Sequence, residues 1–485
     1  MPDNKQHEFI KSLSLFDSMA IVIGSMIGSG IFIVSADMAR MHGSPGLLLA
    51  AWVLTGLLTI FAALSYGELA SMMPKAGGQY IYLRESYGPL VGFLFGWTQF
   101  AVIQTGTIAA VGIAFAKFTS VLIPWFSPEN WIFKIGIFGP FEMPFGKMGP
   151  YNVGLNSQNL LAILTIILLT WINTRGIQKG KFIQNIFTAT KTLALIGLII
   201  IGLFFAMQSG YVTENFTDMW RASKIVDGQL INLSGVALLS IFGASLVGSL
   251  FSADAWNNIT FISGEIKNPK KNIPLSLFYG TVIVTTLYFL ANVVYLITLP
   301  LPEIQNAMQD RVGTAATKVI FGEQATIFMA CLIMISTFGC NNGIILAGAR
   351  MYYAMAMDKL FFKSACELNE NNVPAKGLLT QGIWASILCL TGTYSELLDY
   401  VVFAVLIFYA LTIFGIFILR KKNPDAERPY KAFGYPFIPA IYIIIAVAIC
   451  TNLLFVRPQF TWPGLFIVLL GIPIYYIWNL RKSEK

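Results

Sequence analysis

The residues best suited to chemistry in this sequence are three glycines in the middle of an apolar run. Gly24, Gly28 and Gly30 lie within residues 13–39, most of which are apolar. Each glycine inside a helix costs about 1 kcal/mol relative to alanine, so three close together predict a break in the helix. A break exposes backbone N–H and C=O groups, which a membrane tolerates only where protein or a water-filled cavity receives them. Residues 24–30 are therefore a candidate binding site.

This break offers groups that suit both ends of an α-amino acid. Gly28, Ser29 and Gly30 are small and leave N–H groups free at the start of a half-helix. Such a terminus carries about half a positive charge and suits a carboxylate. The carbonyls that end the preceding half-helix, near Met26, suit an ammonium group. Close helix packing through Gly24-x-x-x-Gly28 is the alternative explanation for two of these glycines.

A second polar cluster, at residues 252–258, interrupts the apolar run from 233 to 262. A carboxylate near the middle of a membrane costs several kcal/mol unless it is solvated or paired, which makes Asp254 a functional candidate. Asp254 is expected to attract the substrate ammonium or a cationic side chain; the alternative is a structural role, such as capping a half-helix. Phe251 and Trp256 bracket it, and they either pack in the core or gate access and line the side-chain pocket.

Lys191 is the most telling single residue. It lies about ten residues into an apolar run that begins at 182, which is about 15 Å along a helix and near the membrane midplane. A lysine so deep does not reach the interface by snorkelling, and its cost of about 2.5 to 3.5 kcal/mol favours a retained role. Its ammonium is expected to replace a coupling sodium ion by bonding carbonyls freed at Gly24, or to lose its proton during transport. Asn341 is a weaker candidate, because hydrogen bonds between helices explain most such residues.

The remaining sequence supplies the helices that must position these residues. Charged residues make up 12% of the 485 residues, against about 25% in soluble domains, and hydrophobic residues make up 56%. The chain is therefore expected to be an all-α membrane protein. Apolar runs long enough for a bilayer core of about 30 Å predict twelve transmembrane helices. They lie at residues 13–39, 46–72, 89–123, 158–174, 182–207, 233–262, 275–299, 324–349, 375–391, 396–419, 436–456 and 461–480.

The distribution of basic residues predicts the orientation in the membrane. The N-terminus, the even-numbered connections and the C-terminus hold 22 of the 32 Lys and Arg residues, the odd-numbered side holds nine, and Lys191 lies inside a span. Because cytoplasmic loops retain Lys and Arg, both termini are expected to be cytoplasmic, in the plasma (cell inner) membrane. The net charge of +8 follows from this topology, and no nucleic-acid-binding motif is present.

Two interrupted helices, in the first and sixth positions, predict an inverted repeat. Discontinuous helices in corresponding positions of two halves form the binding site in transporters of this kind. The expected organisation is a five-plus-five repeat with two appended helices. Its parts are a cytoplasmic tail at 1–12, repeats at 13–207 and 233–420, appended helices at 436–480 and a second tail at 481–485.

Several short segments in the same order resemble a known family, the amino acid-polyamine-organocation superfamily, and within it the L-type amino acid transporter group. The segments are colinear over roughly residues 14 to 420. They are 24–32, 67–69 with 77–82, 184–191, 256–257 with 265–274, and 336–343 through Arg350.

The resemblance implies a leucine-transporter-like fold, sodium-independent movement of amino acids and often obligatory exchange. It also implies that acidic residues at the position of Asp254 allow cationic substrates. This sequence departs from the family pattern at Ala255, where a glycine is usual. By position, the implied roles are carboxylate binding by Gly28, Ser29 and Gly30, carbonyls for the amino group from Met26 and Phe251, gating by Phe251, and a link from the fifth span to the first by Lys191.

Animal relatives often attach to a glycoprotein heavy subunit through a cysteine between spans three and four. Residues 124–157 contain no cysteine. No disulfide-linked heavy subunit is therefore expected, and a stand-alone bacterial permease fits better.

The favoured hypothesis is a sodium-independent secondary transporter, an exchanger of L-amino acids that works by alternating access. One alternative keeps the fold but couples uptake to protons through Lys191. A second, of another class, is a membrane nutrient sensor. An enzyme is disfavoured, because the predicted spans hold no histidine and no nucleophile constellation. No cofactor or metal is expected, and the expected partners are amino acids and the lipid bilayer.

Overall fold

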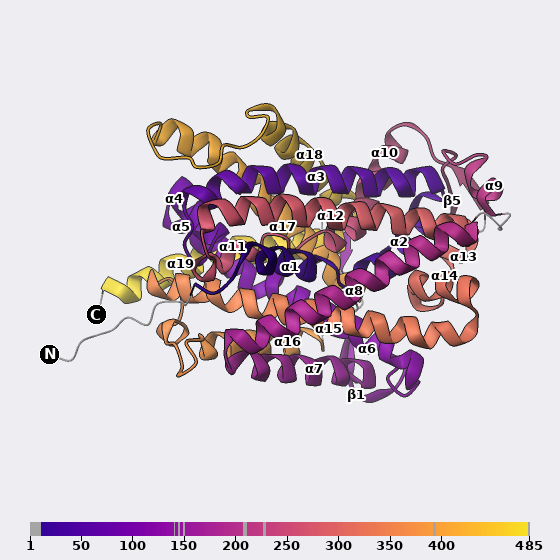
Figure 1. Ribbon diagram of the computed structural model, residues 1–485, viewed down its shortest axis with the longest axis horizontal. Coiled ribbons are helices and arrows are strands. Elements are labelled where there is room, and N and C mark those ends of the chain that lie inside the picture. The colour runs from indigo at the N-terminus through magenta and orange to yellow at the C-terminus, as the bar shows by residue number, and fades with distance from the viewer. Residues whose placement is uncertain are drawn as a thin grey trace.

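The computed structural model describes residues 11–139, 141–143, 146–148, 151–206, 211–226, 229–390 and 394–483. Most helices run along the long axis of the molecule, and the described chain begins and ends at the same end of the bundle (Figure 1). We call this end the terminus side and the opposite end the far side.

Long helices make up the bundle, and shorter helices and strands connect them. The long helices are α1 (Leu15–Met26), α2 (Gly30–His42), α3 (Pro45–Met72), α5 (Pro89–Thr98), α6 (Gln104–Leu122), α7 (Ser157–Thr174), α8 (Ile177–Ala206), α10 (Gly235–Ser252), α12 (Pro269–Thr298), α15 (Glu323–Met357), α16 (Ala375–Leu388), α17 (Tyr394–Lys422), α18 (Phe437–Val456) and α19 (Pro458–Ser483). The short ones are α4 (Gln79–Tyr87), α9 (Tyr211–Phe216), α11 (Asn258–Phe261), α13 (Leu301–Gln305) and α14 (Val312–Phe321), with the π-helical turn η1 (Gln99–Ile103) and the 3-10 turns η2 (Ser263–Glu265), η3 (Met308–Asp310) and η4 (Lys363–Cys366).

The predicted all-α membrane fold is confirmed. Within the described residues, eleven helices are long and apolar enough to cross a membrane, with α1 and α2 counted as one and α5 and α6 as one. The ninth predicted span, 375–391, contains α16, which has 14 residues and is not among the eleven. At 1.5 Å per residue α16 is about 21 Å long, shorter than the bilayer core. It packs against α6, α7 and α15, so it is still part of the bundle.

The connections contain strands, which the sequence analysis does not predict. They form three two-stranded antiparallel sheets, and β5 lies at the far side with α9 and α13 (Figure 1). The strands are β1 (Trp131–Phe138) with β4 (Tyr151–Asn156), β2 (Phe141–Met143) with β3 (Gly146–Met148), and β5 (Ser223–Val226) with β6 (Gln229–Asn232).

The predicted break in the first span is confirmed, but it is narrower than residues 24–30. Helix α1 ends at Met26 because Ile27 adopts extended dihedrals (φ −72°, ψ 93°), and α2 begins at Gly30. Gly24 therefore lies inside α1 and does not form part of the break. The expectation that the break begins at Gly24 is wrong because one glycine costs a helix only about 1 kcal/mol, which surrounding packing overcomes.

The predicted break in the sixth span is also confirmed. Helix α10 ends at Ser252 and α11 begins at Asn258. Between them, Ala255 adopts a positive φ of 65°, which ends any helical continuity. Helix α2 packs against α10, and α1 packs against α11, so the two broken spans lie against each other.

Contacts at the terminus side join the start of α1 to the chain that follows α11. Leu13 forms a parallel β-bridge with Ile266, and the backbone N–H of Leu13 donates to the carbonyl of Glu265 at 3.0 Å. The Glu265 side chain forms a buried ion pair with Arg350 of α15, with Nε and Oε1 3.1 Å apart. Burial raises the pKa of the Glu265 carboxyl, and the Arg350 guanidinium opposes that rise. These contacts hold α1, α11 and α15 together beneath the two breaks.

Candidate functional site

The Lys191 ammonium lies against the carbonyls at the end of α1. Its Nζ donates to the carbonyl oxygens of Gly24 at 2.5 Å, Ile27 at 2.6 Å and Ser336 at 3.4 Å. An ammonium carries three protons, so these three acceptors use its full capacity. The side chain is 2% exposed, and its bonds to Gly24 O and Ile27 O satisfy carbonyls that the end of α1 leaves without helical partners.

Other side chains bond the remaining carbonyls of this break. The Tyr288 hydroxyl of α12 donates to Met26 O at 2.8 Å, and the Cys340 thiol of α15 lies 3.0 Å from Ser25 O. The Ser336 hydroxyl also donates to Ile27 O at 3.2 Å. The unwound backbone is therefore held from three helices, α8, α12 and α15.

Sequence reasoning missed three of these partners. Ser336 and Cys340 are four residues apart and so share one face of α15, within the segment 336–343 that carries the family resemblance. That spacing was a usable signal. No sequence signal pointed to Tyr288, because a tyrosine in an apolar helix is most often a packing residue.

Two carbonyls that were expected to receive the substrate ammonium already accept hydrogen bonds. Met26 O accepts from Tyr288, and Phe251 O accepts from the backbone N–H of Asp254 at 3.1 Å. Phe251 O also accepts from the backbone N–H of Ala253. A carbonyl oxygen has two lone pairs, so Met26 O can accept one further donor beside Tyr288.

The start of α2 touches the end of α10 very closely. A Cβ added at Gly30 would lie 2.1 Å from Ser252 Oγ and 3.0 Å from Ser252 Cα, and one added at Gly28 would lie 3.0 Å from Cys340 Sγ. Close packing therefore requires glycine at position 30 and leaves a Cβ at position 28 in tight contact with Cys340, in addition to any role of their N–H groups. Ser29 occupies the N-cap position between them and is 1% exposed.

In the second break, the Asp254 carboxylate is paired with a tyrosine that the sequence analysis does not identify. The Tyr409 hydroxyl of α17 donates to Asp254 Oδ1 at 2.5 Å. Trp256 packs edge-on against Tyr66, with ring centroids 4.8 Å apart, and lies 5.2 Å from the Tyr409 ring. Trp256 is 2% exposed and thus forms part of the core in this conformation.

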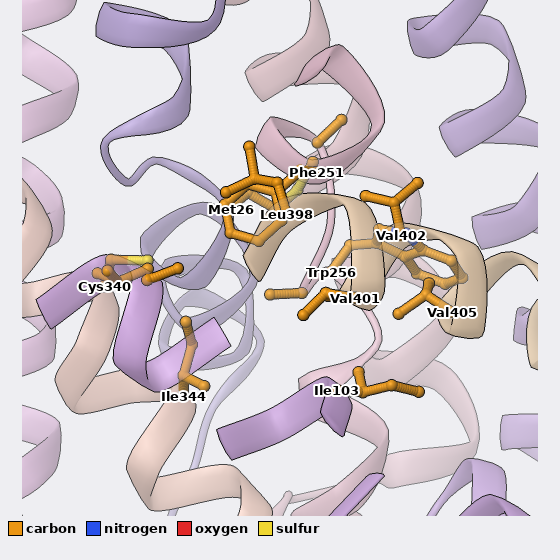
Figure 2. Packing of buried hydrophobic residues seen from close by; sticks show 14 of the residues in the cluster. Met26, Ile103, Phe251, Trp256, Cys340, Ile344, Leu398, Val401, Val402 and Val405 are labelled. Atoms are coloured by element: carbon orange, nitrogen blue, oxygen red, sulfur yellow. The ribbon is translucent and has the colours of Figure 1, made fainter. Parts of the chain in front are cut away.

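Figure 2 shows the apolar surroundings of the two breaks. The indole of Trp256 lies among valines of α17, and Phe251 and Met26 belong to the same buried cluster. The labelled residues of α17 and α15 in this view are Leu398, Val401, Val402, Val405, Cys340 and Ile344. Apart from Tyr409, the wall that α17 forms beside the breaks is therefore apolar.

A small polar cavity adjoins Asp254. The space open to the centre of a water molecule is about 10 Å³, which is enough for about one water. Gln99 donates to Gln104 at 2.9 Å, and Asn257 donates to Gln79 at 2.9 Å, so amides from α4, η1, α6 and the second break surround it. The π-helical turn η1 lies at this cavity, and such turns are frequent at functional sites.

Asn341 bonds α6, not the first break. Its Nδ2 donates to Ile108 O at 3.2 Å, whereas its buried Oδ1 has no hydrogen-bond partner among the described residues. The neighbouring Asn342 accepts from Asn173 of α7 at 2.9 Å. Asn341 therefore joins α15 to α6 and leaves one acceptor unused.

Within the described ranges, no three His, Cys, Asp or Glu side chains group as a metal ion would require.

Ala255 gives a prediction about backbone shape. Its φ of 65° is in the left-handed region, which costs a residue with a Cβ about 1 to 2 kcal/mol. Ala255→Gly is expected to unfold at the same or a higher temperature than the parent. Ala255→Val is expected to lose about 2 kcal/mol, because a β-branched residue fits this region poorly. Thermal unfolding of both variants in one detergent checks these expectations. A valine variant as stable as the glycine variant would show that the backbone at residue 255 is not strained.

The comparison with known families decides what this arrangement is. The sequence matches the amino acid permease family over residues 13–477. The chain belongs to the amino acid permease family. That membership makes it an integral, multi-pass membrane transporter, and support for a non-enzymatic role comes from the family alone.

Curated relatives of this permease include bacterial and human transporters. It is 29% identical to the serine/threonine exchanger SteT of Bacillus subtilis (strain 168), over 98% of each chain. It is 27% identical to the human b(0,+)-type amino acid transporter 1, over 96% of this chain and 88% of the relative. It is 30% identical to the human large neutral amino acids transporter small subunit 2, over 96% of this chain and 80% of the relative.

Proposed function

We propose that this permease is a sodium-independent exchanger of L-amino acids that works by alternating access. The observation that carries the proposal is the Lys191 ammonium bonded to Gly24 O and Ile27 O at the first break. A fixed positive charge at these carbonyls repels a sodium ion from the same acceptors and supplies the bonds that the ion would make. The names of the relatives, which include a serine/threonine exchanger, support exchange.

The two breaks would hold the charged ends of the substrate. The N–H groups of Gly28, Ser29 and Gly30 at the start of α2 bind the carboxylate, because the positive end of the helix dipole lies there. The backbone carbonyls of Met26 and Phe251 bind the ammonium. Both halves of each broken span then tilt around the bound amino acid, within repeats at 13–207 and 233–420.

The access gate and the side-chain pocket would lie at the second break. Phe251 closes access beside Met26, while Trp256 and Asp254 line the pocket, and Asn341 offers its unused Oδ1. Lys191 and Gly24 couple the state of α1 to α8 through their hydrogen bond.

The orientation and partners are part of the same proposal. We place the terminus side in the cytoplasm and the protein in the plasma (cell inner) membrane, because 22 of 32 Lys and Arg residues belong to that side of the predicted topology. One relative is named as a small subunit. Residues 124–157 hold no cysteine, so we propose that this chain has no disulfide-linked heavy subunit.

Counterflow in liposomes tests exchange against proton symport. Purified protein is reconstituted with or without internal unlabelled amino acid, and uptake of a panel of labelled amino acids is measured in sodium or choline buffer. We expect internal amino acid to stimulate uptake at least tenfold, with equal rates in both buffers. Uptake that follows an imposed pH gradient into empty liposomes would instead establish proton coupling and overturn exchange.

Asp254 gives a prediction about substrate charge. If its carboxylate faces the substrate side chain, Asp254→Asn lowers uptake of lysine and arginine about tenfold relative to uptake of leucine, equivalent to 1.4 kcal/mol. The control is Tyr409→Phe, which removes the hydrogen bond to Asp254 but keeps the carboxylate. An unchanged ratio of cationic to neutral uptake in Asp254→Asn would rule out this role.

A further inference from the structure

A surface groove lies between α3, α12 and the segment that links α17 to α18. It has a volume of about 770 Å³, and most of its lining is apolar. Tyr279 and Phe433, two of its walls, are 47% and 66% exposed, so the groove opens on the outside of the bundle. It is separate from the two breaks and from the polar cavity beside Asp254.

Three lysines lie at one end of this groove. Lys270 and Lys271 are in the first turn of α12, at the terminus side, and Lys431 is in the linking segment. Lys270 pairs with Glu427 at 2.8 Å, and both side chains are largely exposed. Lys271 and Lys431 have no carboxylate within ion-pair distance in the part of the chain that the structure describes. The groove therefore presents a net positive charge at this end.

The apolar part of the groove lies deeper along α12. Leu275 and Phe278 follow Lys270 by five and eight residues, which is about 7 to 12 Å along the helix. Helix α12 has 30 residues and is about 45 Å long, against a bilayer core of about 30 Å. We therefore place its basic first turn at the level of the lipid headgroups and Leu275 and Phe278 beside the acyl region.

Hydrogen bonds hold the outer wall of the groove in place. The Glu68 carboxylate of α3 accepts from the backbone N–H of Ala432 at 2.7 Å and from Arg420 at 2.6 Å. A Cβ added at Gly67 would lie 2.8 Å from the Tyr430 ring, so the linking segment packs directly on α3. The groove is therefore already formed.

We propose that this groove binds an anionic phospholipid. Its phosphate contacts Lys270, Lys271 and Lys431, and one acyl chain lies along Leu275 and Phe278. The match is in both charge and depth: basic residues at headgroup level select anionic lipids, and the apolar wall below them excludes water from an acyl chain. A soluble anion would use the lysines alone and leave the apolar wall exposed.

Native mass spectrometry of the detergent-solubilised full chain tests the charge. Phosphatidylglycerol and phosphatidylcholine with the same acyl chains are added, and lipid adducts are counted. We expect the parent to retain more phosphatidylglycerol than phosphatidylcholine. In the triple variant Lys270→Gln, Lys271→Gln, Lys431→Gln, the ratio of phosphatidylglycerol to phosphatidylcholine adducts is expected to fall at least about fivefold. The matched control replaces three other exposed lysines of the same side by glutamine: Lys75, Lys363 and Lys421. Equal loss in the control, or none in the groove variant, overturns the proposal.

A second variant tests the apolar part while keeping every lysine. Leu275→Trp fills the groove below the lysines and is expected to lower phosphatidylglycerol adducts several-fold. Glycerol phosphate, which has no acyl chain, is expected not to displace the lipid. Displacement by glycerol phosphate, or full retention of lipid by Leu275→Trp, would show a simple anion site and overturn the lipid assignment. Equal thermal unfolding of all variants verifies that they fold.

Discussion

Lys191→Ala is expected to lower amino acid uptake at least about 100-fold, equivalent to about 2.7 kcal/mol. The substitution removes the donor that bonds Gly24 O, Ile27 O and Ser336 O. Ile27 O keeps the Ser336 hydroxyl as a donor, whereas Gly24 O loses the donor that Lys191 supplies. A buried acceptor left unsatisfied costs about 1 to 3 kcal/mol, so the end of α1 is expected to lose its fixed position. The binding geometry at the neighbouring Gly28 depends on that position.

Uptake into liposomes with internal amino acid is the measurement. The control is Lys117→Ala, a lysine of α6 whose charged neighbours are Asp310, Arg311 and Arg40, not the first break. It is expected to retain most of the uptake. Thermal unfolding separates a misfolded variant from an inactive one. A folded Lys191→Ala protein that exchanges at the parent rate would contradict the role given to the ammonium.

Gly30→Ala is expected to abolish measurable exchange. The added Cβ would lie 2.1 Å from Ser252 Oγ, 2.7 Å from Ser252 Cβ and 3.0 Å from Ser252 Cα. Rotation of the serine hydroxyl relieves only the first of these contacts, so α2 and α10 must separate. Overpacking of this kind costs about 1 to 3 kcal/mol and displaces the first turn of α2.

A second change at the same contact makes this prediction specific. Ser252→Gly removes both side-chain atoms that the new Cβ meets, so the double variant Gly30→Ala with Ser252→Gly is expected to recover part of the exchange. The matched control is Gly197→Ala in α8, where an added Cβ meets no atom within 4 Å. Normal exchange by Gly30→Ala, or no recovery in the double variant, would show that the contact with Ser252 is not the cause.

Both breaks could be located from the sequence because charged residues and clustered glycines are unfavourable within an apolar membrane span. A charged residue in an apolar run costs about 2.5 to 3.5 kcal/mol and each glycine in a helix about 1 kcal/mol, so Lys191, Asp254 and the three glycines of the first span stand out against their surroundings. The same reasoning over-extended the first break to Gly24, since a single glycine does not end a helix that is well packed. The strands were missed because they lie in the connections, where apolar periodicity is weak.

The sequence by itself determined the membrane class, the two interrupted spans and the depth of Lys191, because hydropathy and the cost of buried charge act on local stretches of chain. Only the tertiary structure decided which groups meet: Tyr288 with Met26, Tyr409 with Asp254, and Gly30 with Ser252. These partners are common residue types on distant helices. Their pairing depends on how the helices cross, which no local pattern in the sequence records.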